Sequence, residues 1–313
     1  MEKENFFAKK RTFLFQQLLL DWGKHNFRDF PWRNELEDPY IILCTEILLQ
    51  KTSAEKVLPI FSNFFELFPT VKVLADSNLD DVASVIKPLG LQNKKASALV
   101  NAARWVVQNG EITSSNLKVL KENVKGVSDY VTNAVSCFCF GEKVPLIDVN
   151  VKKILKLVFG VEKEIEIEMI LGSCTENLRK SEVKNFYFAL IDLGSAIRSN
   201  TKNLLEEKVA IIPVEEKSFE KILTRRVYGR FKHVDFKREV SYLLIYQKSP
   251  IKTITHLCKI KCKKTSDSVV NYSLNPILEL QIPITLEKND YPPVSYKYTK
   301  LLNVIRAFSY SDL

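Results

Sequence analysis

The chain has 313 residues, of which 46% are hydrophobic and 27% charged, with only 9 Gly and 12 Pro. This composition is typical of a globular protein and excludes a fibrous repeat or a wholly disordered chain. The formal net charge of +9 is concentrated near the C-terminal end, because residues 214–313 carry 18 Lys and Arg against 10 Asp and Glu. Such a basic region favours a polyanion such as nucleic acid as a partner, although a merely soluble surface has a similar composition.

No apolar run approaches the roughly 18–20 residues needed to span a bilayer. The first ten residues mix acidic and basic side chains, and no small-residue cleavage site follows, so no signal peptide is indicated. We expect an intracellular protein, in the cytoplasm or nucleoid or in a eukaryotic nucleus, without a membrane partner.

The six cysteines do not provide two pairs with the spacing of metal ligands, so they are expected to remain thiols. They are Cys44, Cys137, Cys139, Cys174, Cys258 and Cys262.

The first two thirds of the chain predict one helix after another. Apolar positions recur at helical spacing over residues 43–68, and Pro69-Thr70 ends this stretch. Leu79 begins another helix that has acids in its first turn. The segment 162–168 alternates charged residues with Ile and predicts either a solvated helix or a short strand. Further helical patterns occupy residues 95–107, 130–140, 149–158 and 183–191.

The pattern changes at about Ile211. Runs of β-branched and aromatic residues predict strands over 240–246, 253–261 and 277–286, and Pro283 predicts an edge position for the last one. The polar segment 203–217 is predicted to be a linker. A helix near residues 298–308 is expected to close a small strand-rich domain. Residues 241–246 and 249–254 of this domain faintly resemble those of PUA/ASCH-like β-barrels.

A lone acid, Glu46, interrupts the apolar helical stretch 40–49. A carboxylate in such a position is costly unless it is paired, and burial raises its pKa toward the range that acid–base catalysis uses. Taken alone, this residue is better explained by a salt bridge inside the fold.

A glycine-bearing turn over residues 124–128 separates two helical runs, and Asp148 lies between an apolar run and a helix. A turn at the start of a helix exposes backbone N–H groups that can hold a phosphate, although most such turns only connect helices. Asp148 is a natural N-cap, and that role alone would explain it.

Seven segments in this order resemble those of the helix-hairpin-helix (HhH-GPD) DNA glycosylases, with the MutY-like adenine glycosylases and the archaeal mismatch-specific thymine glycosylases as the nearest branches. The resemblance runs from about residue 27 to residue 197. It implies an all-α fold of two helical lobes, with a cleft into which a mispaired or damaged base of double-stranded DNA is flipped. The predicted organisation is a helical glycosylase domain over 1–205 and a basic, strand-rich α+β domain over 214–313. The segments are PWR (31–33), DPY (38–40), TEILLQKT (45–52), GLQNKKA (90–96), KGVSDY (125–130), LIDVNVKK (146–153) and ALIDLGSAI (189–197).

By position, the resemblance makes Asp148 the essential aspartate of the family and Glu46 the essential glutamate of the adenine branch. Breaking an N-glycosidic bond builds positive charge on the sugar, which an Asp carboxylate stabilises, while a Glu of raised pKa can protonate the departing base. Tyr130 occupies the position at which bifunctional relatives carry a lysine that forms a Schiff base. We therefore expect base removal without strong strand cleavage.

The resemblance places Gln50 and Lys51 in the loop that fills the gap left by the flipped base. The adenine branch usually has Gln-Gln there, so Lys51 is slightly nearer the thymine branch. In the hairpin, Ser128 replaces a glycine of the family, which predicts weaker phosphate and cation binding, partly compensated by the charge of Lys125. The remaining predicted DNA contacts are Asn93, Lys125, Gly126, Val127, Ser128 and Lys152.

Many relatives hold an iron–sulfur cluster with four cysteines just after the segment matched by 189–197. Here Arg198 stands at the first of these positions, and no cysteine follows until Cys258. Because the cluster requires cysteine thiolates, no cluster and no other cofactor is expected.

The expected function is therefore that of a monofunctional DNA glycosylase of base excision repair. Its substrate is thymine or uracil opposite G, or adenine opposite G or oxidised G. Two alternatives remain open: a catalytically inactive module that binds DNA lesions, and a glycosylase for a modified base in a defence or restriction system. The sequence names no protein partner and no oligomeric state.

Overall fold

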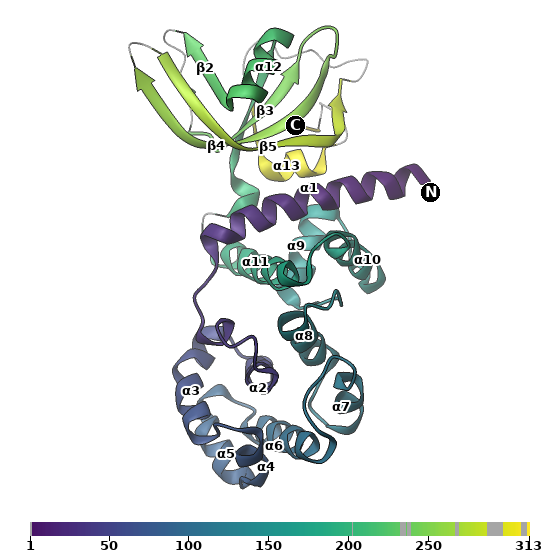
Figure 1. Cartoon of the computed structure of the whole chain (residues 1–313), viewed down its shortest axis with the longest axis vertical. Coiled ribbons are helices and arrows are strands. Elements are labelled where there is room, and N and C mark those ends of the chain that lie inside the picture. Colours follow the sequence, from purple (N-terminus) through teal and green to yellow (C-terminus); the bar gives the residue numbers. More distant parts are fainter. Residues whose placement is uncertain are drawn as a thin grey trace. The chain divides into compact units, whose positions relative to one another are not determined.

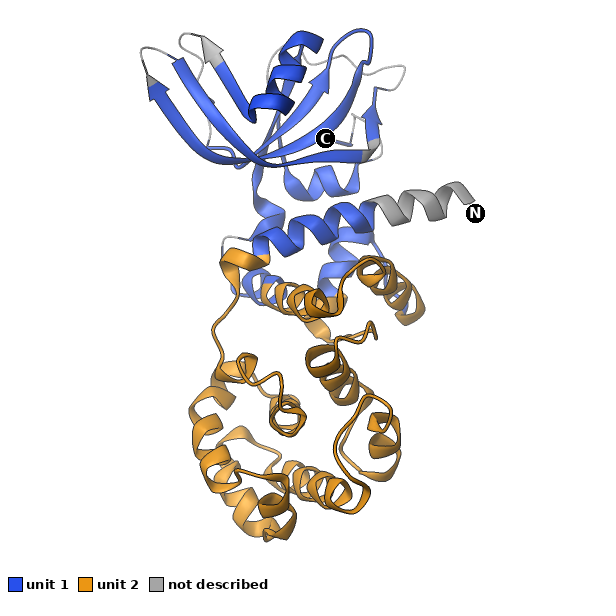
Figure 2. Cartoon of the chain, in the orientation of Figure 1, with its two compact units in different colours: residues 1–22, 153–163, 193–313 blue, residues 23–152, 164–192 orange. Residues whose placement is uncertain are grey.

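The computed structural model describes residues 2–201, 203–231, 236, 239–266, 269–286, 297–307 and 312–313. The chain divides into two compact units (Figure 2). The first comprises residues 1–22, 153–163 and 193–313, and the second comprises residues 23–152 and 164–192. Within the described residues, no helix has the length and apolar character that a bilayer crossing requires.

The second unit is helical. Its helices (Figure 1) are connected by loops that include two 3-10 turns, η1 and η2. The helices α9 and α11 both begin in this unit and end in the other one. The elements are η1 (Pro31–Arg33), α2 (Pro39–Leu49), α3 (Ala54–Leu67), α4 (Val71–Asp76), α5 (Leu79–Val85), η2 (Lys87–Leu89), α6 (Gln92–Asn109), α7 (Leu117–Asn123), α8 (Asp129–Phe140), α9 (Val149–Phe159), α10 (Glu164–Thr175) and α11 (Lys180–Arg198).

The helices predicted from the spacing of apolar residues are present, with two refinements. The apolar pattern over 43–68 belongs to two helices, because Gln50–Ser53 break it and α3 starts only at Ala54. The segment 162–168, for which a helix or a strand was expected, lies largely in helix α10. The side chain of Ile167 is buried there, whereas 61% of Ile165 is exposed, because residues two apart lie on different faces of a helix.

The first unit contains a six-stranded sheet of order β2-β5-β4-β3-β1-β6. All neighbouring strands are antiparallel except β1 and β3, which are parallel. The core of this sheet includes Ala210, Ile212, Leu243 and Ile245, which are fully buried. The elements are η3 (Leu204–Glu206), β1 (Lys208–Val214), α12 (Glu216–Arg225), β2 (Val227–Phe231), β3 (Tyr242–Gln247), β4 (Thr253–Ser266), β5 (Val269–Thr285), β6 (Lys297–Lys300) and α13 (Leu301–Arg306).

The linker predicted over residues 203–217 is wrong, because this segment contains η3, strand β1 and the start of α12. Strand β1 lies between β3 and β6, and residues 209–212 are fully buried. The edge position predicted by Pro283 is confirmed locally: residues 269–273 of β5 lie between β2 and β4, whereas Thr285 and Ile284 pair with β4 beyond the end of β2.

Helix α1 (Glu2–Asn26) belongs to the sheet-containing unit up to Trp22. The guanidinium of Arg11 donates hydrogen bonds to the carbonyl oxygens of Ile305 in α13 and Val158 in α9, both at 3.0 Å. An ion pair of 2.6 Å joins Asp21 to Lys259 of β4. A hydrogen bond and an ion pair therefore join helix α1 to α13 and β4, which lie in the last third of the given sequence.

Candidate active site

Helix α2 positions the first predicted catalytic residue. The Asp38 carboxylate caps the helix by accepting hydrogen bonds from the backbone N–H groups of Tyr40 (2.8 Å) and Ile41 (3.4 Å), and Pro39 occupies the first turn. Almost every following side chain of α2 is buried. Glu46 shares this environment and is only 6% exposed.

The carboxyl of Glu46 has an unusual electrostatic environment. Burial raises its pKa to about 8, and the nearby charge of Asp148 contributes to the increase, whereas the Arg33 guanidinium opposes it. A buried carboxyl with this pKa is largely protonated at neutral pH. The salt bridge that would have explained Glu46 as a purely structural residue is not found, since none of the ion pairs among the described residues includes it.

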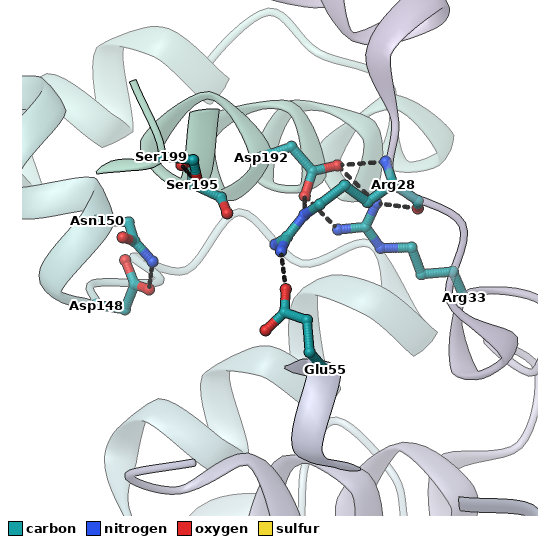
Figure 3. Close-up of polar contacts among 8 residues, drawn as sticks. All are labelled: Arg28, Arg33, Glu55, Asp148, Asn150, Asp192, Ser195 and Ser199. Carbon is teal, nitrogen blue, oxygen red and sulfur yellow. Dashed lines mark hydrogen bonds and ion pairs between the residues drawn. The ribbon is translucent and has the colours of Figure 1, made fainter. Parts of the chain in front are cut away.

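Asp148 lies at the start of α9, after the fully buried Leu146. One carboxylate oxygen accepts a hydrogen bond of 2.7 Å from the backbone N–H of Val151, and the other accepts one of 2.9 Å from the Asn150 side chain (Figure 3). The predicted N-cap is therefore present. These hydrogen bonds also orient the half-buried carboxylate of Asp148, whose negative charge raises the pKa of Glu46.

Tyr130 lies in the first turn of α8, which packs against α2. Its pKa is raised well above the ordinary value, first by burial and then by the charges of Glu46 and Asp148. Asp148 thus acts on the pKa of Glu46, and both carboxyl groups act on the pKa of Tyr130, so the three predicted catalytic residues lie near one another. Glu46 lies in α2, Tyr130 lies in α8, and Asp148 directly precedes α9.

The hairpin between α7 and α8 depends on Gly126. This residue has a φ of +101°, and a Cβ atom there would lie 2.7 Å from the Cβ of Ala98 in α6. Glycine is therefore required both by the backbone and by the close approach of α6. Ser128 has an extended backbone with φ −101°, and its hydroxyl caps α8 by accepting a hydrogen bond of 3.4 Å from Val131. A glycine is thus not needed at position 128 for its conformation.

The residues predicted to contact DNA differ in accessibility. The side chain of Val127 is buried, and its N–H donates to the carbonyl of Val124 at 3.2 Å, so this residue offers neither group to a ligand. Gln50 is half-buried and donates a hydrogen bond of 2.9 Å to the carbonyl of Gly126. The side chains of Lys51, Asn93, Lys125, Ser128 and Lys152 are exposed.

A buried ionic cluster beside this site was not predicted from the sequence. Asp192 of α11 is 2% exposed and accepts hydrogen bonds from both Arg28 and Arg33 (Figure 3). Arg33 binds through two nitrogens, at 2.7 and 2.9 Å, and its guanidinium lies 4.4 Å from the ring centroid of Phe188. Arg33 also acts on the pKa of Glu46, so this cluster fixes a positive charge beside the candidate acid.

The sequence contained one signal for this cluster: Asp192 is a lone acid in the apolar segment 189–197.

Arg33 also lines an open pocket of about 450 Å³ at the N-terminus of α2. The lining of this pocket does not include Glu46, Tyr130 or Asp148.

Comparisons with known proteins place the chain in a family. Residues 44–180 match the family model described as "HhH-GPD superfamily base excision DNA repair protein". The thymine-DNA glycosylase of Aeropyrum pernix is 31% identical over 211 residues, which make up 64% of this chain and 93% of that protein. The chain belongs to the HhH-GPD superfamily of base excision DNA repair proteins.

Two further comparisons concern this HhH-GPD protein. A solved structure of a thermostable thymine-DNA glycosylase is similar with a TM-score of 0.53 and 30% sequence identity, covering 60% of this chain and 87% of the other. An adenine DNA glycosylase of Mycobacterium tuberculosis is 30% identical over 138 residues, which are 44% of this chain and 45% of that protein. The predicted helical glycosylase fold is confirmed for the N-terminal region, and the described C-terminal region contains the expected sheet.

The residues after α11 do not fit the iron–sulfur cluster that many HhH-GPD proteins contain. Such a cluster takes four cysteine thiolates, but no cysteine lies between Cys174 and Cys258 in the sequence. All six cysteines are free thiols. In the described part of the chain, no group of three or more His, Cys, Asp or Glu side chains is arranged to hold a metal ion.

Proposed function

We propose that this protein is a monofunctional DNA glycosylase that flips a mispaired base out of duplex DNA and hydrolyses its N-glycosidic bond. The observation that carries the proposal is the mutual proximity of Glu46, Tyr130 and Asp148, expressed in the pKa shifts of Glu46 and Tyr130. Membership of a base excision repair family supports this function.

Asp148 is proposed to stabilise the transition state. Cleavage of the N-glycosidic bond leaves the electron pair on the base and positive charge on the sugar, which an oriented carboxylate stabilises. The hydrogen bonds from Val151 and Asn150 hold the Asp148 side chain before the substrate binds, so little reorganisation is needed during the reaction.

Glu46 is proposed to be the general acid. With its pKa raised to about 8, the carboxyl carries a proton at neutral pH and can transfer it to the departing base. A water molecule then adds to C1′ of the sugar, and the carboxylate left by this transfer is available to accept the proton that the water releases.

Tyr130 is proposed to limit the reaction to base removal. Strand cleavage by the bifunctional relatives requires an amine that forms a Schiff base at C1′. A tyrosine has no such amine, and its raised pKa keeps the phenol protonated and able to donate a hydrogen bond in the site.

Thymine or uracil opposite guanine is the substrate that we propose first. The similarity to the thymine-DNA glycosylase covers 93% of that protein, whereas the similarity to the adenine glycosylase covers 45% of its length. Lys51 in the loop between α2 and α3 agrees with the thymine branch. Adenine opposite guanine or oxidised guanine is the second candidate, because the adenine branch also carries the glutamate that corresponds to Glu46.

The test is a panel of duplexes that contain each mismatch, uracil, oxidised bases or methylated bases, incubated with the full-length protein and then with alkali to reveal abasic sites. We expect cleavage after alkali at T·G and U·G pairs, little cleavage without alkali, and none with Asp148→Asn. Mismatch-selective binding without any product would instead show an inactive lesion-binding module. Turnover of only a methylated or otherwise modified base would indicate a defence or restriction role.

We further propose that the sheet module adds contacts to DNA phosphates. Residues 214–313 carry a net charge of +8, and β4 contains the exposed lysines Lys261 and Lys264. Each phosphate contact removed lowers the slope of log affinity against log salt by about 0.9. The double variant Lys261→Gln/Lys264→Gln is expected to reduce this slope by about 2; an unchanged slope would favour a partner-docking or stabilising role. The PUA/ASCH-like assignment of this module stays a prediction.

A further inference from the structure

Lys95, in the second turn of α6, has a buried side chain that the proposed reaction does not use. The residue is 2% exposed, and burial lowers the pKa of its ammonium to about 8. None of the ion pairs among the described residues includes Lys95. Burying a cation without a carboxylate partner is costly, so the groups that this ammonium does contact are informative.

Both hydrogen bonds of the ammonium go to the end of α2 and the segment that follows it. The Nζ atom donates to the carbonyl oxygen of Leu48 at 2.7 Å and to the hydroxyl oxygen of Thr52 at 2.6 Å. The last turn of a helix carries unsatisfied carbonyl groups and partial negative charge, which favour a cation there. Lys95 therefore joins α2 to the segment Gln50–Thr52.

The segment Gln50–Thr52, which we call the α2–α3 loop, is held at further points. The Thr52 hydroxyl lies 3.2 Å from the carbonyl oxygen of Leu89, and the Gln50 side chain donates to the carbonyl of Gly126. The loop is thus tied to α6, to the end of η2 and to the hairpin.

Between these attachment points, Lys51 has a φ of +53°, a left-handed conformation that is unfavourable for a residue other than glycine. A strained conformation of this kind persists only where its surroundings fix it. The attachments on either side of Lys51 provide that constraint, and the Lys51 side chain is exposed.

We propose that Lys95 is a positioning residue, which holds the α2–α3 loop in the conformation that presents Lys51 to the DNA. This role rests on the proposed function, in which the loop fills the gap left by the flipped base. Lys95 touches neither the substrate nor the reacting atoms. Its ammonium acts through Leu48 and Thr52, so its removal affects base extrusion and excision more than the first encounter with duplex DNA.

The experiment compares the full-length protein with Lys95→Met, which keeps the length of the side chain and removes the charge. Thr52→Val removes the loop acceptor and serves as a second variant in case Lys95→Met folds poorly. Lys72→Met, at an exposed lysine of α4, is the matched control. Amide hydrogen exchange over residues 48–54 is measured without DNA, and single-turnover excision and duplex affinity are measured with a T·G duplex.

We expect exchange over 48–54 to be at least tenfold faster in Lys95→Met and Thr52→Val, with the remaining peptides unchanged. Single-turnover excision should slow at least tenfold while duplex affinity changes less than threefold, and Lys72→Met should match the wild type. Unchanged exchange over 48–54, faster exchange throughout the chain, or faster local exchange with normal excision would each overturn the proposal. If the wild type excises no base, the proposed function fails, and the exchange comparison alone decides whether Lys95 holds the loop.

Discussion

Asp148 lies close enough to Glu46 for its negative charge to add to the effect of burial, and together they raise the pKa of the Glu46 carboxyl to about 8. Two acids held close together in different environments can divide the work of a hydrolytic site, one donating a proton and the other stabilising positive charge. Five predictions concern this pair and the elements that support it.

The rate of base removal is expected to fall as pH rises through about 8. Above this pH Glu46 loses the proton that the departing base requires, so the ionised form is the inactive one. Single-turnover rates on a T·G duplex between pH 6 and 10 would show this falling limb. A rate that stays constant to pH 10 would exclude Glu46 as the general acid.

The contribution of Glu46 to the stability of the protein is expected to decrease as pH rises from about 4.5 to 8. In this window the folded state retains the Glu46 proton that the unfolded chain has released, so raising the pH favours unfolding. Glu46→Gln removes this dependence and should stabilise the protein at pH 9 by a few kcal/mol, because each pKa unit corresponds to about 1.4 kcal/mol. Urea unfolding of both proteins at pH 5 and pH 9 measures the effect, and an equal difference at both pH values would contradict it.

Asp148→Asn and Asp148→Ala separate capping from catalysis. An asparagine oxygen can still accept the hydrogen bond from Val151, so the unfolding free energy should change by less than about 1 kcal/mol, whereas alanine should lose about 1 kcal/mol. Both variants should slow base removal at least about 100-fold, because both lack the negative charge. Loss of activity in Asp148→Ala but not in Asp148→Asn would assign the residue a capping role alone.

Gly126→Ala is expected to destabilise the hairpin by about 1–3 kcal/mol and to weaken duplex binding. The added Cβ atom would clash with Ala98, and the φ of +101° is unfavourable for alanine. Ser128→Gly is the control, because Ser128 has an ordinary extended backbone and glycine is a tolerable cap, costing only a few tenths of a kcal/mol. Thermal unfolding and duplex affinity at fixed salt, measured for both variants, should show a loss for Gly126→Ala and little change for Ser128→Gly.

Arg33→Met should move the falling limb of the pH–rate profile to higher pH. The guanidinium lowers the pKa of Glu46, so removing its charge raises that pKa further. The substitution also leaves buried Asp192 with Arg28 as its remaining arginine partner, which should cost about 2 kcal/mol or more of stability. A limb that remains at the same pH would show that the charge of Arg33 is screened from the site.

The proposed catalytic residues Glu46 and Asp148 could be singled out because each carries a local signal within a motif of fixed order. Glu46 is a charge in an apolar helix, and Asp148 is a polar residue between a buried run and a helix start. The ionic cluster was missed because Arg28, Arg33 and Asp192 are brought together only by the fold. Nothing in the local sequence states which arginine reaches a given acid.

One error has its origin in interactions between distant segments. The segment 203–217 looked polar enough for a linker, but its apolar residues 209–212 are buried by pairing with strands β3 and β6 further along the chain. The weaker phosphate and cation binding expected from Ser128 stays a prediction. The structure adds that the positive φ of the hairpin lies at Gly126, whereas Ser128 has an extended backbone.

The attachment of α1 to Ile305 and Lys259 has a consequence for synthesis on the ribosome. Helix α1 is translated before its partners, which follow Arg11 by 294 residues in α13 and Asp21 by 238 residues in β4. Contacts between such remote positions form late and slow the search for the native state. The hydrogen bond and the ion pair that hold α1 can therefore form only after these distant segments have been synthesised.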